Sequence, residues 1–302
     1  MKSRRQPVKL REGENADPPS SERTVRAIYR KLSRAWGPQH WWPAETAFEV
    51  IAGAILTQNT SWTNVERALA NLRQAGMLSA EGIRELPVGE LESLIRSSGY
   101  FRQKAQRMKN LIAFLDEHYR GSLDAMFGTP TQQLRTELLA QKGIGPETAD
   151  SILLYAGHHP IFVVDAYTRR VLERHDSVAT NAKYDEIRNL VEIALRREEP
   201  SPGVTHAKLE PQRPAAHPPS AISTAPRAPL AQVYNEMHGL FVQLGKHYCH
   251  KKLPACMECP LGSMLPRPVR SASPATTHEP PSVVKRRPSR VQRNRGYNQT
   301  RP

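Results

Sequence analysis

The segment 134–157, LRTELLAQKGIGPETADSILLYAG, carries the pattern most specific for chemistry. Gly143 and Gly145 stand between two runs with helical periodicity and predict a turn too tight for side chains. Pro146 follows where a helix begins, so the turn exposes backbone amides that suit one DNA phosphate without reading the bases. An ordinary helical hairpin with a glycine cap is the alternative. The candidate DNA contacts in the turn are Lys142, Gly143, Ile144 and Gly145.

Two further groups of residues could bind a ligand. Every tryptophan lies before residue 63, as Trp36, Trp41, Trp42 and Trp62. The cysteines, Cys249, Cys256 and Cys259, follow a C-x6-C-x2-C spacing. Three cysteines are too few for a disulfide framework, which fits a reducing cytoplasm.

Apolar residues recur at helical spacing over most of the chain. We therefore expect helices to position the glycine turn, the tryptophans and the cysteines. The run 161–164, at four residues, is too short to predict a sheet. The sequence therefore predicts an all-α fold with about ten helices. They are expected over 21–35, 45–57, 62–75, 86–99, 101–119, 131–141, 146–157, 166–174, 183–197 and 231–248.

Charge and proline are unevenly distributed along the 302 residues. The formal net charge is +14, and residues 266–302 hold nine basic residues and one acidic residue. The segment 199–230 holds eight prolines and few large apolar residues. We expect both segments, and residues 1–20, to be disordered, because they cannot bury enough apolar surface to offset the entropy of ordering. A basic excess also suggests a polyanionic partner.

Four segments in order resemble the helix-hairpin-helix DNA glycosylases of the endonuclease III superfamily. Besides the glycine hairpin they are ILTQNTSWTNVERA (55–68), SSGYFRQKAQRMKNL (97–111) and PIFVVDAYTRRVLERH (160–175). The resemblance extends from about Trp41 to Cys259. It implies two helical domains. One is a six-helix barrel over 44–159 that contains the hairpin; the other combines 21–43 with 160–265.

The resemblance places Asp165 on the essential carboxylate of the family. A carboxylate beside a breaking N-glycosidic bond stabilises the oxocarbenium character of the sugar and can orient or deprotonate water. Asp is also a favoured helix N-cap, so Asp165 can cap the helix 166–174, and both roles can hold together.

Glu147 stands where bifunctional members of the family have a lysine that forms a Schiff base with the sugar. A carboxylate cannot form a Schiff base. Lys142 is nearby but lies on the other side of the glycine turn. The resemblance therefore implies a monofunctional glycosylase that leaves the abasic site intact, with Glu147 as a second candidate catalytic residue.

The run HWWPAETAFEVIAGAILTQNTSW (40–62) looks like the bacterial 3-methyladenine glycosylase branch. Its base pocket, carried over, consists of Trp41, Trp42, Pro43 and Trp62. Aromatic faces bind a flipped, cationic 3-methyladenine by stacking and by cation–π attraction of about 1–2 kcal/mol. Core or interdomain packing is the alternative for these tryptophans. Gln58 would fill the gap left in the duplex, and a helix-end cap is its alternative role.

The cysteines resemble the [4Fe–4S] loop of the family, which continues with a fourth cysteine. That position is Leu265 here, whereas such a cluster normally takes four cysteine ligands. Three interpretations stay open: a three-cysteine cluster with an outside ligand, a degenerate loop without iron, or zinc held by three cysteines and one histidine.

The sequence thus predicts a monofunctional DNA N-glycosylase of base-excision repair for alkylated purines. The alternatives are an endonuclease III-like enzyme for oxidised pyrimidines, with possible lyase activity, and a non-catalytic helix-hairpin-helix DNA-binding protein. The expected partner is double-stranded DNA with a damaged base. We expect a monomer in the bacterial cytoplasm, associated with the nucleoid and not with a membrane, since no stretch of about 18 apolar residues occurs.

Overall fold

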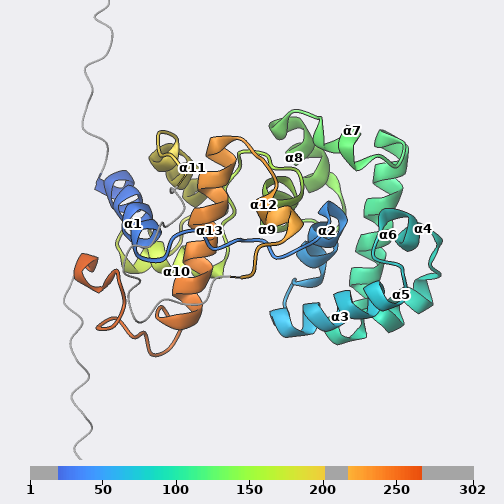
Figure 1. Cartoon of the computed structure of the whole chain (residues 1–302), viewed down its shortest axis with the longest axis horizontal. Helices are drawn as coiled ribbons and strands as arrows, with labels where there is room; N and C mark the ends of the chain where they lie inside the picture. The colour runs from blue at the N-terminus through green and yellow to red at the C-terminus, as the bar shows by residue number, and fades with distance from the viewer. Residues whose placement is uncertain (1–19, 201–216, 267–302) are drawn as a thin grey trace, which may run out of the picture. The chain divides into compact units, whose positions relative to one another are not determined.

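The computed structural model describes residues 20–200 and 217–266, and they fold into helices without a β-strand (Figure 1). The predicted all-α fold is confirmed, while the division into two helical domains stays a prediction. The predicted disordered ends of the chain lie outside the described residues, apart from Ser20 and Pro266. No helix in the described part is both long enough and apolar enough to cross a membrane.

The helices follow one another with short connections. They are α1 (Ser20–Trp36), α2 (Ala47–Leu56), α3 (Trp62–Gln74), α4 (Ala80–Glu85), α5 (Val88–Leu94), α6 (Phe101–Tyr119), α7 (Leu123–Phe127), α8 (Thr131–Ala140), α9 (Pro146–Ser151), α10 (Ala166–Arg174), α11 (Tyr184–Leu195), α12 (Ala221–Thr224) and α13 (Pro229–His247). A π-helical turn, Ile152–Ala156, continues α9, and 3-10 turns occupy Arg96–Ser98 and Gly262–Met264.

Each helix expected from the periodicity is present, with bounds shifted by a few residues. The short helices α4, α7 and α12 were not predicted, because four to six residues are too few to display a helical period. The run 161–164 is buried between the π-helical turn and α10 and forms no strand, as the sequence predicts.

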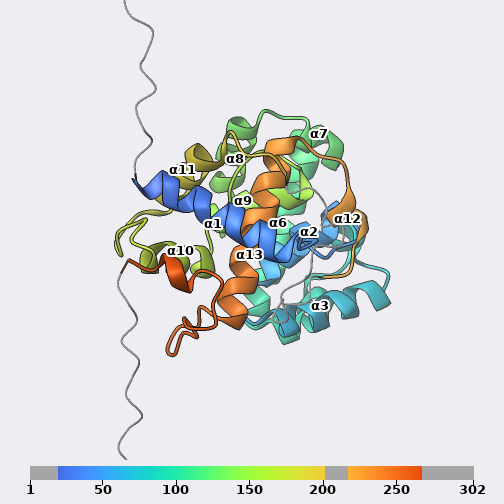
Figure 2. The same ribbon diagram turned by 60° about the vertical axis from the view of Figure 1, so that its left-hand side comes forward.

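Helix α13 runs through the middle of the described residues (Figure 2). It packs against α1, α10, α11 and the π-helical turn. Because neighbours surround it, α13 is buried on nearly every side from Ala231 to Gly245. A second group of packed helices consists of α2, α3, α4, α5 and α6.

The structure contradicts the predicted disorder over part of 199–230, since residues 217–230 are ordered. Ser220 caps α12, and its hydroxyl accepts the N–H of Ala44 at 3.3 Å. The N–H of Ile222 donates to the carbonyl of Ala44 at 3.1 Å. Hydrogen bonds to the chain after Trp42, rather than a large apolar face, therefore hold this segment, and composition does not reveal them. Residues 201–216 lie outside the described part.

A buried ion pair joins the two helices of the glycine hairpin to α11. The Arg135 guanidinium donates to both carboxylate oxygens of Asp150, at 2.7 and 3.2 Å, and to Asp185 at 2.9 Å. Asp150 is fully buried and Arg135 is 9% exposed. Since a buried carboxylate is costly without a partner, Arg135 fixes the position of α9 against α8.

We predict that Arg135→Met lowers the free energy of unfolding by about 3–5 kcal/mol, because Asp150 loses its partner while it stays buried. Urea denaturation measures this. The control is Arg84→Met, which removes a pair to the partly exposed Asp116 and is expected to cost at most about 1 kcal/mol. Equal losses in the two variants would contradict the prediction.

Candidate active site

The predicted glycine hairpin is present as α8, a turn and α9. Gly143 has φ +91°, and a Cβ there would lie 2.3 Å from Nε of Arg107, so this position requires glycine. Gly145 differs, since a Cβ there would meet nothing within 4 Å. The prediction of a turn too tight for side chains is therefore confirmed at Gly143 and wrong at Gly145.

The other residues of the turn also differ from one another. The Ile144 side chain is buried, and its N–H already donates to the carbonyl of Gln141 at 3.0 Å, so Ile144 anchors the turn. Lys142 is exposed. Contacts of this turn with a DNA phosphate stay a prediction.

Gln58, which follows α2, lies against this hairpin. Its amide donates to the carbonyl of Gly143 at 3.1 Å and to the Thr148 hydroxyl at 2.9 Å. The Arg107 guanidinium donates to its amide oxygen. Gln58 must give up these three bonds before it can enter a duplex, so its predicted role requires a rearrangement.

An open pocket of about 410 Å³ connects Gln58, the hairpin and Glu147. It is lined by Ala54, Thr57, Gln58, Asn59, Arg107, Gly143, Glu147, Thr148 and Ser151. The Glu147 side chain reaches solvent through it, while the surrounding protein removes part of its hydration. This desolvation, together with repulsion from Asp165, raises the pKa of Glu147 to about 6, and attraction to His238 opposes the shift.

Asp165 caps α10, as one of its two predicted roles requires. Its Oδ1 accepts the N–H of Thr168 at 2.7 Å. Nε2 of His238 lies 3.6 Å from its Oδ2, and the side chain is 14% exposed. Burial favours the neutral acid, but His238 and the Thr168 N–H outweigh it and lower the pKa of Asp165. Asp165 is therefore ionised at neutral pH.

Two further buried residues, Tyr155 and His238, lie beside Asp165. The sequence analysis did not predict either of them. The Tyr155 hydroxyl lies 2.6 Å from Nδ1 of His238, and both side chains are buried. Burial raises the pKa of Tyr155 well above its usual value, so the hydroxyl keeps its proton beside Nδ1. The other ring nitrogen of His238, Nε2, faces Oδ2 of Asp165 at 3.6 Å. The available signal was a histidine next to the apolar run GLFV (239–242) in α13.

The structure gathers the three tryptophans of the predicted base pocket into one cluster. The ring centroids of Trp42 lie 5.4 Å from Trp41 and 5.1 Å from Trp62. Trp42 also lies 5.2 Å from Tyr155, and Trp41 lies 6.2 Å from His238. Trp41 and Trp42 are buried, while Trp62 is half-buried, as is Pro43. The cluster therefore adjoins Asp165 through Tyr155 and His238.

The cluster holds two features that plain core packing does not require. The indole N–H groups of Trp42 and Trp62 are buried without a hydrogen-bond partner in the described residues. Such groups are costly, so apolar packing alone does not account for them. Lys246 places its ammonium 5.6 Å from the Trp41 ring, and burial lowers its pKa although Glu66 and Asp165 oppose the shift. The sequence analysis did not identify this amine.

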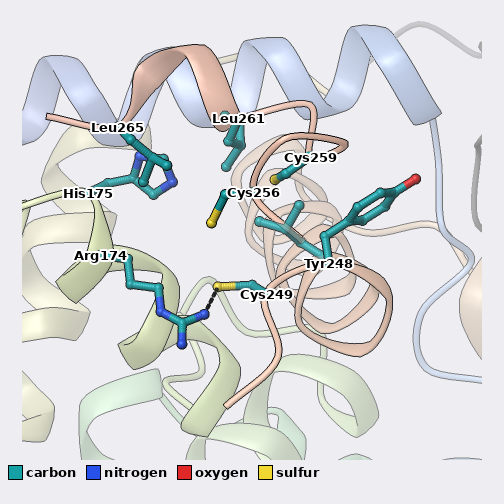
Figure 3. Close-up of a pocket in the computed structure, with 10 residues that line it drawn as sticks. Arg174, His175, Tyr248, Cys249, Cys256, Cys259, Leu261 and Leu265 are labelled. Atoms are coloured by element: carbon teal, nitrogen blue, oxygen red, sulfur yellow. Dashed lines mark hydrogen bonds between the residues drawn. The ribbon is translucent and has the colours of Figure 1, made fainter. Parts of the chain in front are cut away.

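The three cysteines line one pocket with Arg174, His175 and Leu265 (Figure 3). The Arg174 guanidinium donates to Sγ of Cys249 at 3.0 Å. Burial raises the pKa of Cys259 to about 11 and also raises that of Cys256, which favours thiols over thiolates.

These residues do not fit the cluster that the resemblance implies. The pocket has a volume of about 20 Å³, which is room for about one water molecule. A [4Fe–4S] cluster has eight atoms and four thiolate ligands, and Leu265 supplies none. Within residues 20–200 and 217–266, no three His, Cys, Asp or Glu side chains are grouped so that they could hold a metal ion.

The chain is similar to known proteins of one family. Residues 52–197 match the HhH-GPD superfamily of base excision DNA repair proteins. A protein of Methanocaldococcus jannaschii that is named as a DNA repair glycosylase is 40% identical over 239 residues, 78% of this chain and 93% of that protein. Endonuclease III of Thermotoga maritima is 26% identical, over 70% of this chain and 79% of its own length.

Solved structures show the same fold. The 3-methyladenine DNA glycosylase of H. pylori bound to 1,N6-ethenoadenine is 29% identical, with a TM-score of 0.57 over 75% of this chain and 97% of that one. Endonuclease III trapped covalently on DNA is 20% identical, with a TM-score of 0.60 over 81% of this chain and 95% of that one. The chain therefore belongs to the HhH-GPD superfamily of base excision DNA repair proteins, which are endonuclease III-like DNA glycosylases.

Proposed function

We propose that the chain is a monofunctional DNA N-glycosylase that removes alkylated purine bases, with Asp165 as the catalytic carboxylate. The observation that carries this proposal is the placement of an ionised Asp165 beside the aromatic cluster. DNA glycosylase activity follows from the family. The substrate, the role of Asp165 and the absence of a lyase step belong to the proposal.

The reaction requires negative charge next to the sugar. As the N-glycosidic bond breaks, Asp165 stabilises the positive charge that develops on the sugar, and it can orient or deprotonate the attacking water. His238 acts as a positioning residue, because its Nε2 faces Oδ2 while the Thr168 N–H holds Oδ1. Tyr155 holds the His238 ring in place through its hydrogen bond at Nδ1.

The aromatic cluster suits an alkylated purine. Such bases carry a positive charge, so the faces of Trp41, Trp42 and Trp62 attract them by stacking and cation–π interaction. The base is also a good leaving group, so a strong general acid is unnecessary. Likeness to the H. pylori 3-methyladenine glycosylase, whose structure holds 1,N6-ethenoadenine, supports this substrate class.

We predict that Asp165→Asn lowers the rate of 3-methyladenine release from methylated DNA by at least about 10²-fold, because a neutral amide stabilises the cationic sugar poorly. Asparagine remains a good N-cap, so α10 and DNA binding are expected to be preserved. Wild-type activity on thymine glycol, with none on methylated purines, would overturn the substrate assignment. His238→Gln keeps an N–H donor and is expected to retain more activity than His238→Leu.

Borohydride trapping tests the monofunctional assignment. We expect no covalent adduct between the wild-type enzyme and DNA, because position 147 holds a carboxylate instead of an amine. Lys142 and Lys246 are the amines to examine, the first at the hairpin turn and the second beside Trp41. An adduct that disappears in Lys142→Ala or Lys246→Ala would show a lyase step and refute the assignment.

The pKa of Glu147 predicts the acid limb of the pH profile. Its carboxyl is neutral below a pKa of about 6 and charged above it. A second negative charge near the cationic sugar lowers the barrier, so kcat/KM is expected to rise between about pH 5 and 7. Glu147→Gln should flatten this limb. A wild-type rate that falls through pH 6 would instead indicate that the protonated Glu147 is the active form.

A further inference from the structure

The loop after α13, residues 248–265, occupies the place where the family resemblance implies an iron–sulfur cluster. We propose that this loop, here named the Cys loop, folds without a metal and is held by two arginines of α10. These are Arg170 and Arg174, which we call the arginine clamp. The proposal concerns the cofactor and does not depend on the substrate or on Asp165.

The arginine clamp makes three hydrogen bonds to the beginning of the loop and one to the end of α13. Arg170 donates through Nε to the carbonyl of Cys249 at 2.6 Å and through Nη2 to that of Gly245 at 3.5 Å. Arg174 donates to Sγ of Cys249 at 3.0 Å and to the carbonyl of Lys251 at 3.2 Å. The two arginines are four residues apart, so both lie on the face of α10 that packs against α13.

Close packing reinforces the clamp where α13 ends. The Tyr167 ring lies so near Gly245 that a Cβ there would be 2.0 Å from it. The Arg170 guanidinium in turn lies 5.1 Å from the centroid of the same ring. The Tyr248 ring stacks on Trp36 of α1, with centroids 6.0 Å apart. Protein side chains therefore fix the entry to the loop from two helices.

The far end of the loop is also held by protein groups. The Ala255 N–H donates to the carbonyl of Tyr248 at 2.9 Å, which closes the loop on itself. Leu261 is fully buried, and the Ser263 hydroxyl accepts from Lys31 of α1 at 2.8 Å. A Cβ at Gly262 would lie 2.2 Å from the carbonyl oxygen of Cys256, so the chain packs backbone against backbone here. These contacts tie the far end of the loop to itself and to α1.

The residues at the expected ligand positions explain why the loop does not fit a cluster. Leu265 stands at the fourth ligand position, and a guanidinium contacts the first cysteine of the set. His175 lines the same pocket next to Leu265, with Nδ1 3.4 Å from the carbonyl of Met264 (Figure 3). A zinc ion on three cysteines and His175 is thus the competing occupant, and the experiment must distinguish it.

Metal analysis of the full chain tests the proposal. The protein is produced with added iron and, separately, with added zinc, and is purified without oxygen. Iron, zinc, sulfide and the absorbance near 400 nm are then measured for the wild type and for Leu265→Cys, which restores the fourth thiolate. We expect the wild type to hold far less than one metal ion per chain and the variant to gain iron, sulfide and the absorbance band.

Every other pattern of metal content counts against the proposal. A wild type with stoichiometric iron and sulfide, or with one zinc ion per chain, overturns it. Failure of Leu265→Cys to gain a cluster shows that the missing ligand is not the reason, and that part of the proposal fails.

Thermal unfolding provides an independent readout. Arg174→Met is expected to lower the midpoint by about 2–4 °C, since it removes bonds to Cys249 and Lys251. The double variant Cys256→Ser, Cys259→Ser should change it by less than about 2 °C, because neither thiol would carry a metal. Arg102→Met, at an exposed arginine of α6, controls for the loss of charge. A cysteine variant that unfolds far below Arg174→Met would contradict the metal-free loop.

Discussion

A carboxylate that loses its water becomes neutral unless hydrogen-bond donors and positive charge replace the solvent, and the candidate site depends on this constraint. At Asp165, the groups that replace the solvent come from parts of the chain that are far apart in sequence. Its own helix supplies the Thr168 N–H, and α13 supplies His238. Tyr155, from the π-helical turn after the hairpin, holds His238. The hairpin that is predicted to contact DNA is therefore connected, within a few residues, to the side chains that support the carboxylate.

The same constraint separates the two acidic residues of the site. One oxygen of Asp165 accepts the Thr168 N–H, the other lies 3.6 Å from Nε2 of His238, and the pKa of Asp165 is lowered. Glu147 lies in the wall of an open pocket, and its pKa is raised to about 6. Sequence position alone makes them look equivalent, since each begins a helix. Their environments give them different charges near neutral pH, which lets one act as a permanent anion and the other respond to pH.

Periodicity and turn chemistry were enough to predict most helices and the hairpin, because each signal lies within a few neighbouring residues. Gly143 illustrates this, since a positive φ is required there. Other features could not be predicted in this way. The free space beside Gly145 depends on how the turn is surrounded in three dimensions. The order of residues 217–230 and the pair formed by Tyr155 and His238 depend on contacts between residues at least 83 positions apart. One sequence does not record such contacts. The predicted base pocket is intermediate: its tryptophans were identified, but the unpaired indole N–H groups of Trp42 and Trp62 and the nearby Lys246 became visible only in three dimensions.

Helices α10 and α13 connect the site to the Cys loop. Asp165 begins α10 and the arginine clamp lies farther along it, while His238 lies in α13, whose end leads into the loop. A shift between these two helices would therefore change the distance from His238 to Asp165 as well as the clamp. In a chain that lacks the fourth cysteine, the guanidinium bonds of Arg170 and Arg174 keep the helices in register. The geometry at Asp165 and the fold of the Cys loop therefore depend on the same pair of helices.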